Sequence, residues 1–282
     1  MKSLADKCML VNIRFGQWTA KKYDKSVSGE IERQHNATNA GRYNKTLIPE
    51  EYLANIHSIV SAARGFLKEQ TLPWGDNSDR LIQSADVIGF LDQFRTYKDQ
   101  FDAEVTSFIS KYEQLKQEAS WKLNSLYRES DYPTAGRLKK KFFIEVSCLP
   151  IGNVDDFRVT VDPAELERLK AGMLKEYQSR MAEATQDIWN RISRIVGHMA
   201  RKLSDPDAIF RDSLVGNVQD LIGLLPKLNF SEDSVIDEVI DDMRRLIVDP
   251  DTLRTDSQIR SRVATEAQQI LERLGIAVAE AA

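Results

Sequence analysis

A basic cluster near the middle of the chain holds the side chains with the clearest binding chemistry, and it leads directly into Phe142 and Phe143. The cluster consists of Arg137, Lys139, Lys140 and Lys141. A second basic group, near the start of the chain, consists of Lys21, Lys22 and Lys25. Cations beside exposed aromatic rings suit single-stranded nucleic acid, because phosphates meet the cations and bases stack on the rings. The simpler alternative is a solvated helix-to-strand connection in which both phenylalanines are buried.

No pattern typical of an active site accompanies these cations. The acidic pairs of the chain are Glu165 with Glu167, Asp237 with Glu238, and Asp241 with Asp242. Solvated helix faces and helix dipoles explain such pairs better than general acid–base catalysis. His57 and His198 fall within predicted helices, without a carboxylate or cysteine partner evident in the sequence. Since the chain also lacks a phosphate-binding loop of the G-x-x-x-x-G-K-S/T type, we expect neither an enzyme nor a cofactor.

The composition is that of an ordinary water-soluble chain, with 282 residues of which 42% are hydrophobic and 29% charged. No run approaches the ~20 apolar residues of a membrane span, so we expect no membrane partner. The first residues lack the apolar stretch of a secretion signal, which favours a cytoplasmic location. Cys8 and Cys148 are interpreted as small buried residues in a reducing compartment rather than as a disulfide. With three histidines and two cysteines far apart, no zinc site is expected.

Charge is distributed unevenly along the chain, although the net charge is only −4. Residues 1–50 carry nine Lys or Arg against five Asp or Glu, whereas residues 201–282 carry ten against sixteen. A basic start and an acidic end could bind different partners or pair with each other. Ordinary solvated surface is the alternative, and it accounts for most of these charges.

Two long amphipathic helices are the dominant predicted elements. The first, over residues 78–128, repeats apolar residues at alternating steps of four and three, which is typical of a coiled-coil seam. Its seam consists of Phe101, Val105, Phe108, Tyr112, Leu115, Ala119 and Leu126. The second, over residues 162–203, begins at Asp162 and Pro163, which favour a helix start, and carries an apolar stripe to its end. We expect these helices to form a long antiparallel hairpin.

Alternating apolar residues predict short strands at 9–15, 142–148 and 157–161. The last two are expected to form a β-hairpin over 142–161, and the first to join them, since two strands alone are marginal. The predicted fold class is mainly α with a small antiparallel β element, a long helical hairpin and a C-terminal helical bundle. The predicted domains are an N-terminal strand and polar segment over 1–48, the hairpin over 49–203, and the bundle, packed on the hairpin, over 204–282.

Several short motifs resemble those of a family of uncharacterised tailed-phage proteins. They are Leu72-Pro73-Trp74-Gly75-Asp76, Asp131-Tyr132-Pro133, Asp156-Phe157-Arg158-Val159 and Phe210-Arg211-Asp212-Ser213-Leu214-Val215, with Leu10-Val11-Asn12 and Trp18 near the start. The resemblance runs through nearly the whole chain. It implies a phage origin and expression in the bacterial host cytoplasm, and it supplies no catalytic residue or substrate. Because relatives are often encoded near a MoxR-type AAA+ ATPase and a von Willebrand A protein, it also implies an adaptor role with an AAA+ machine.

Three functional hypotheses follow from these patterns. The first is a non-catalytic interaction or adaptor protein that self-associates and binds protein partners, including an AAA+ ATPase, through the surfaces of its long helices. The alternative is a single-stranded nucleic-acid-binding protein of phage DNA metabolism that acts through the two basic groups. A weaker alternative, supported by the phage resemblance alone, is an inhibitor of a host defence system.

Overall fold

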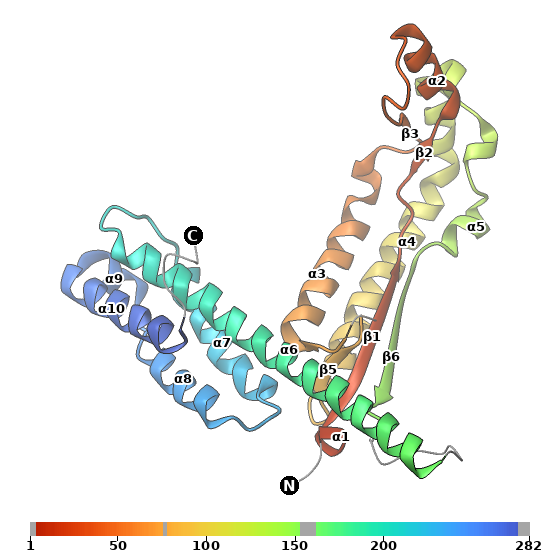
Figure 1. The fold of residues 1–282 in the computed structure, drawn as a ribbon. Helices are drawn as coiled ribbons and strands as arrows, with labels where there is room; N and C mark the ends of the chain where they lie inside the picture. The colour runs from red at the N-terminus through yellow and green to blue at the C-terminus, as the bar shows by residue number, and fades with distance from the viewer. Residues whose placement is uncertain (1–3, 76–77, 153–161, 276–282) are drawn as a thin grey trace. The chain divides into compact units, whose positions relative to one another are not determined.

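The computed structural model describes residues 4–75, 78–152 and 162–275 (Figure 1). Within these residues the chain forms ten α-helices, and its strands form one four-stranded and one two-stranded sheet. The predicted fold class is confirmed, since the protein is mainly helical with a small antiparallel sheet, a long helix and a C-terminal set of helices. None of the described helices is both long enough and apolar enough to cross a bilayer.

The elements up to the longest central helix are α1 (Leu4–Lys7), β1 (Cys8–Gly16), β2 (Lys21–Tyr23), α2 (Lys25–Gln34), β3 (Asn44–Thr46), the 3-10 helix η1 (Glu50–Leu53), α3 (Ala54–Gln70), β4 (Leu72–Pro73), β5 (Arg80–Gln83) and α4 (Val87–Leu123). The later elements are η2 (Asn124–Leu126), η3 (Glu129–Asp131), α5 (Ala135–Lys139), β6 (Phe143–Pro150), α6 (Pro163–Ser204), α7 (Ser213–Leu228), α8 (Ser234–Arg244), α9 (Pro250–Thr255) and α10 (Ser257–Arg273).

Internal contacts divide the chain into two compact units. Unit 1 comprises Met1–Asn12, Lys68–Ile88 and Ser147–Ala282, and unit 2 comprises Ile13–Leu67 and Gly89–Val146. Each unit is therefore assembled from segments far apart in the sequence. The helix α6 belongs to unit 1, whereas α4 belongs to unit 2 from Gly89 onward.

Unit 1 is organised by the second part of α6, whose apolar stripe is buried from Ala184 to Leu203. This stripe packs with α7 and α10 in one hydrophobic core that also includes residues of α8 and α9. The helix starts where the sequence predicts, because the Asp162 carboxylate accepts a hydrogen bond from the Ala164 N–H at 2.8 Å. Aspartates also cap the starts of the C-terminal helices α8, α9 and α10; they are Asp233, Asp249 and Asp256.

Two arginines of unit 1 bind the end of α3. Arg191 donates hydrogen bonds to the carbonyl oxygens of Lys68, Glu69 and Thr71 at 2.6–2.8 Å. Arg80 donates to the Thr71 hydroxyl at 2.6 Å and to the Thr71 carbonyl at 3.0 Å. The last carbonyls of a helix have no partner within the helix, so these guanidinium groups satisfy acceptors that would otherwise need water.

The predicted helix over residues 78–128 begins later than expected. Residues 80–83 form strand β5 instead, and α4 starts at Val87. In the sheet order β4-β5-β1-β6, β5 is an inner strand, and its adjacent residues Leu81 and Ile82 are both buried. Neighbouring strand residues point to opposite faces, so their burial requires cover on both sides, which a short apolar run cannot reveal.

The small sheet otherwise follows the sequence pattern. Strand β1 covers the predicted segment 9–15, and β6 covers most of 142–148 and lies beside β1. The other strand of the predicted β-hairpin, residues 157–161, lies outside the described residues. Both cysteines carry free thiols; Cys8 is buried, which raises its pKa to about 12, whereas Cys148 is partly exposed.

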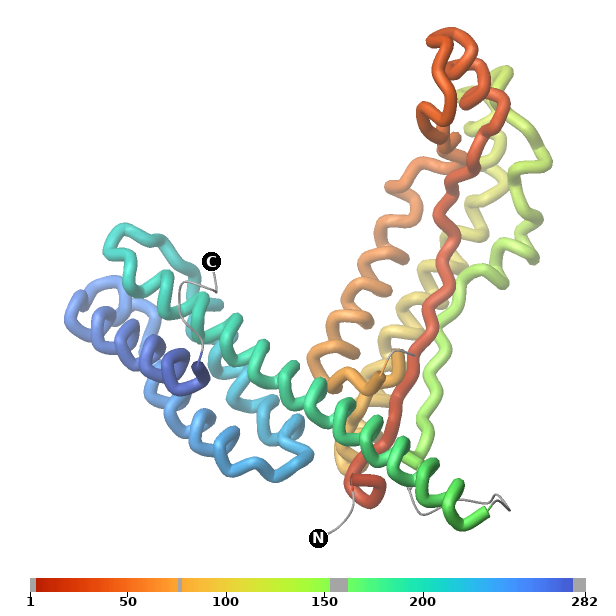
Figure 2. Tube along the Cα trace, in the orientation of Figure 1, coloured from red at the N-terminus to blue at the C-terminus, as the bar shows by residue number. Residues whose placement is uncertain are grey.

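Unit 2 is organised by α4, whose predicted seam is buried against its neighbours. The buried seam residues are Phe101, Val105, Phe108, Tyr112, Leu115 and Ala119. Trp18 packs edge-on against Tyr112, with ring centroids 5.9 Å apart, and Phe142 packs edge-on against Phe108 at 5.9 Å. Figure 2 shows the traces of α3, α4, β1 and β6 running alongside one another in this unit. Aromatic rings therefore join these elements into the core of unit 2.

Candidate anion-binding pocket

Several short elements of unit 2 gather around the end of α4. Strands β2 and β3 pair antiparallel, with Lys21 opposite Thr46 and Tyr23 opposite Asn44. In Figure 1 this small ribbon and α2 lie toward the end at which α4 finishes, and α5 lies beside α4 farther from that end. Segments that precede α3 and segments that follow α4 are thereby brought together, although both helices separate them in sequence.

A buried lysine holds these segments to one another. The Lys45 side chain is 1% exposed, and its ammonium group lies 2.7 Å from the Asp131 carboxylate and 3.3 Å from that of Asp24. It also donates a hydrogen bond to the Leu126 carbonyl at 2.6 Å. An ammonium has three N–H donors, and each has a partner here. Lys45 therefore ties β3, the start of α2 and the chain after α4 into one charged cluster.

The second carboxylate of this cluster, Asp24, also caps α2. Its oxygens accept hydrogen bonds from the Ser26 hydroxyl at 2.6 Å and from the Val27 N–H at 3.3 Å, besides the contact with Lys45. These hydrogen bonds, that of Ser26 first, hold the pKa of Asp24 well below its usual range. Asp24 therefore stays ionised and keeps its contact with Lys45 at neutral pH.

A pocket opens beside this cluster, with a cavity volume of about 700 Å³. Four cationic residues line it, and they are Lys21, Lys22, Arg137 and Lys141. Three hydroxyl residues line it as well, and they are Thr19, Ser130 and Thr134. We call this cavity the basic pocket. Cations and hydroxyl donors around one cavity are the groups that bind phosphate and carboxylate oxygens.

The positive charge of the basic pocket is not balanced by acidic residues of the same lining. Its one acidic lining residue, Asp131, pairs with Lys45, which also pairs with Asp24, so this cluster carries one net negative charge against the four cations of the lining. Lys21 lies 4.0 Å from Glu50, and both side chains are exposed, so this pair is weak. Among the described residues, Lys22, Arg137 and Lys141 form no ion pair within 4.0 Å. The pocket therefore presents a positive potential to solvent.

Two aromatic residues, Trp18 and Tyr132, also line the basic pocket, and each is 7% exposed. The Tyr132 hydroxyl donates a hydrogen bond to the Leu47 carbonyl at 3.1 Å, and burial raises the pKa of Tyr132 to about 12. Trp18 is held by its ring contacts with Phe108 and Tyr112. The pocket therefore has a fixed, partly apolar wall beside its mobile cationic side chains.

The structure places the seven predicted nucleic-acid-binding residues in two groups. Lys21, Lys22, Arg137 and Lys141 line the basic pocket. Lys25, Lys139 and Lys140 are exposed but do not line it. The stacking partners expected from the sequence are not available, because Phe142 is a core residue and the Phe143 ring covers Gly16 so closely that no Cβ would fit there. Phe142 is therefore buried, as the alternative expects, whereas Phe143 is only partly buried.

Sequence reasoning missed three residues of this site. Trp18 and Tyr132 lie three and five positions before Lys21 and Arg137, so an aromatic next to each basic group was a usable signal. No sequence pattern indicates the role of Lys45, because its partners Asp24 and Asp131 are far from it in sequence. Trp18 and Tyr132 also fall in the short motifs that resemble the tailed-phage family.

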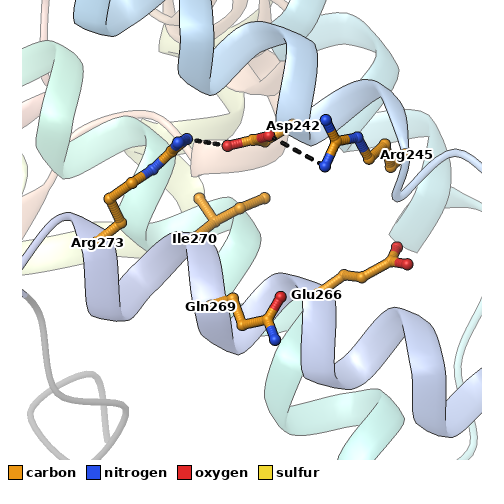
Figure 3. Close-up of a pocket in the computed structure, with 6 residues that line it drawn as sticks. All are labelled: Asp242, Arg245, Glu266, Gln269, Ile270 and Arg273. Carbon is orange, nitrogen blue, oxygen red and sulfur yellow. Dashed lines mark hydrogen bonds and ion pairs between the residues drawn. The ribbon is translucent and has the colours of Figure 1, made fainter.

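In a second pocket, in unit 1, the cationic side chains are paired with an acidic side chain of the same lining (Figure 3). It lies between α8 and α10, has a cavity volume of about 270 Å³ and contains two arginines, Arg245 and Arg273. Both guanidinium groups pair with the Asp242 carboxylate, from Arg245 at 3.4 Å and from Arg273 in close contact. With Glu266 as a second acid, the lining carries equal numbers of positive and negative side chains. We call it the ionic pocket.

At least one member of each acidic pair has a structural partner. Glu165 pairs with Arg168, and Asp241 pairs with Arg244, both within a helix. The Asp237 carboxylate accepts a hydrogen bond from the Asn229 amide at 3.3 Å. Among the described residues, no cluster of three or more His, Cys, Asp or Glu side chains could hold a metal ion.

No family model, no curated protein and no solved structure matches this chain. The resemblance to the tailed-phage family, and the phage origin that it implies, therefore stay predictions.

Proposed function

We propose that the protein binds single-stranded nucleic acid at the basic pocket of unit 2. One observation carries this proposal: four cationic side chains from two remote segments line a single cavity, and the one acid in that lining is paired with a buried lysine. Such an arrangement costs stability through charge repulsion, and the weak contact between Lys21 and Glu50 does little to offset it. A polyanionic ligand supplies the missing negative charge.

The size of the cavity favours a single strand over a duplex. Ligand pockets of roughly 300–1,000 Å³ hold small molecules, so about 700 Å³ accommodates one or two nucleotides but not a double helix. Arg137 can hold a phosphate through two N–H groups at once, whereas the three lysines act as point charges. Trp18 and Tyr132 are buried core residues, so they form a rigid wall of the pocket and not a stacking surface.

A salt-dependent anisotropy titration tests this function. Labelled single-stranded DNA is expected to bind wild-type protein with an affinity that falls steeply between about 50 and about 200 mM salt, because bound phosphates release counterions. The double variant K22E/R137E is expected to bind at least about tenfold more weakly, since it reverses two phosphate contacts. Absence of binding at low salt, or equal affinity of the two proteins, would refute the proposal.

A second candidate function is the non-catalytic interaction or adaptor role, and one observation favours it. The first part of α6 carries Leu169, Met173 and Leu174, which are 40–48% exposed and lie outside the core of unit 1. Exposed apolar residues along a helix are typical of a surface that packs on a partner helix. We propose self-association through this face, with an AAA+ ATPase as a further partner and the cytoplasm of an infected bacterium as the setting.

Size-exclusion chromatography with light scattering tests the adaptor role, with and without the candidate ATPase. The wild-type chain is expected to elute as an oligomer, and the variant L169E/M173E as a monomer with unchanged helical content. A wild-type chain that stays monomeric and binds no ATPase would exclude this role and leave the nucleic-acid proposal untouched.

A further inference from the structure

The cationic and hydroxyl residues of the basic pocket are gathered around one cavity, and this bears on which part of a strand can bind there. They come from the segment around β2 and from the segment between Ser130 and Lys141. A groove that follows a backbone needs phosphate contacts spread along its length, as in proteins that cover several nucleotides. Here the contacts gather at one place.

A terminal phosphate fits such a place better than an internal one. An internal phosphodiester carries one negative charge and is flanked by nucleotides on both sides. A terminal phosphate monoester carries a charge of roughly −1.5 to −2 near neutral pH and presents three acceptor oxygens. It can also enter a cavity end-on, because the chain continues from one side only.

The donors around the cavity match that chemistry. Four cations exceed what one singly charged diester requires, and they suit a group with nearly two charges. The Thr134 hydroxyl oxygen already accepts a hydrogen bond from the backbone N–H of Arg137 at 3.4 Å, so the hydroxyl hydrogen of Thr134 is available to donate to a ligand. Thr19 and Ser130 supply further hydroxyl groups.

The wall of the pocket is fixed before any ligand arrives. Asp131 is held by Lys45, and Tyr132 is held through Leu47. A preformed wall lowers the ordering cost of binding, and it leaves only the surface cations to move.

We propose that the basic pocket receives the terminal phosphate monoester of a nucleic-acid strand, so that the protein recognises strand ends rather than strand interiors. This inference rests on the proposed function, which requires only that single strands bind at these cations. It adds the chemical group that the pocket recognises and the position of that group on the strand.

Three oligonucleotides of one sequence, about 12 nucleotides long, test the inference: one with a 5′-phosphate, one with a 3′-phosphate and one with hydroxyl groups at both ends. The account predicts that one phosphorylated oligonucleotide binds at least about tenfold more tightly than the hydroxyl form. It also predicts that this preference shrinks at about pH 5, because a phosphate monoester with a second pKa near 6 is then singly charged.

Matched variants separate the pocket from the general positive charge around it. R137Q/K141Q removes two cations of the lining, whereas K139Q/K140Q removes two exposed neighbours outside it, with the same change in net charge. The end preference is expected to fall to within about twofold of unity in R137Q/K141Q and to persist in K139Q/K140Q. Adenosine monophosphate is expected to compete with the phosphorylated oligonucleotide for the wild-type protein.

The outcomes distinguish the two proposals. If all three oligonucleotides bind wild-type protein equally, and K22E/R137E still weakens each of them, the end inference is wrong and the proposed function stands. If none binds, both are wrong. If adenosine monophosphate binds but no oligonucleotide does, the pocket recognises a free mononucleotide, and the strand-end inference is overturned together with the proposed function.

Discussion

The ionic pocket of unit 1 contains two cations and the basic pocket of unit 2 contains four, yet only in the ionic pocket does every cation pair with an acid of the same lining. In the ionic pocket, Arg245 and Arg273 share the carboxylate of Asp242, so the group contributes to the packing of α8 on α10 (Figure 3). In the basic pocket, Arg137 and Lys141 have no ion-pair partner among the described residues. The comparison separates cations that form ion pairs within the fold from cations that remain available to a ligand.

In unit 2, the buried ion-pair cluster around Lys45 lies directly beside the exposed cations of the basic pocket. Lys45 pairs with two carboxylates in the protein interior, and one of them, Asp131, faces the basic pocket. Without Lys45, that carboxylate would cancel part of the pocket's charge. The buried pair therefore has two consequences, since it stabilises the end of unit 2 and it keeps the pocket positive.

The largest expected effect in this comparison is on stability. Lys45→Met removes the cation that pairs with both Asp24 and Asp131, which is expected to cost about 3–5 kcal/mol. Lys25→Met, at an exposed residue outside this cluster, is expected to change stability by less than about 0.5 kcal/mol. Urea unfolding of both variants measures the difference, and equal midpoints would show that the buried cluster contributes nothing.

Acid should weaken the same cluster. The pKa of Asp24 is lower in the folded protein than in the unfolded chain, so its stabilising contribution is present above the unfolded value near 4 and is lost as pH falls toward the folded value. Asp24→Asn removes that carboxylate and is expected to give a flatter loss of stability below about pH 4. Thermal unfolding across this range compares the two proteins, and parallel curves would contradict the assignment.

A smaller effect is expected on binding when the cations of β2 are neutralised. K21Q/K22Q removes two pocket cations and should lower the salt dependence of single-strand binding by up to about two released ions. K25Q/K139Q changes the net charge equally but outside the lining, so its slope should stay closer to that of the wild type. Anisotropy titrations at several salt concentrations give the slopes. A larger change in the control variant would place the strand outside the pocket.

The smallest effect is expected in unit 1. Asp242→Asn removes the shared partner of Arg245 and Arg273, which are both partly exposed, so the cost should be about 1 kcal/mol or less. Single-strand affinity should not change, because the freed arginines lie outside the proposed site. A gain in affinity would show that unpairing two arginines is enough to create an anion site. It would contradict the claim that the basic pocket differs from the ionic pocket as a binding site.

Local signals predicted the elements of this fold better than their partners. The seam from Phe101 to Ala119 is buried as its heptad spacing indicates, and Asp162 caps α6 as its sequence indicates. What covers each stripe depends on remote residues. Trp18 and Phe142 cover the seam of α4, and α7 and α10 cover α6, neither of which follows from the spacing of apolar residues alone.

For the candidate site too, the sequence predicted some residues but not their partners. Four of the seven predicted cations line the pocket, since adjacent basic residues are visible in any sequence. The role of Phe142 was not predictable, because an aromatic residue after a basic run is equally compatible with a stacking surface and with a core position. Trp121 shows the converse, since it lies beside the seam in sequence but is 75% exposed. Tertiary packing decides such cases, and composition does not.

A side-by-side comparison of two double variants tests the central claim most directly. R137Q/K141Q and R245Q/R273Q change the net charge by the same amount, the first at unpaired cations of the basic pocket and the second at paired cations of the ionic pocket. The account predicts that single-strand affinity falls about tenfold in the first variant and changes less than about twofold in the second. Equal losses in both variants would mean that the protein binds nucleic acid through overall charge, and the claim for a specific pocket would be wrong.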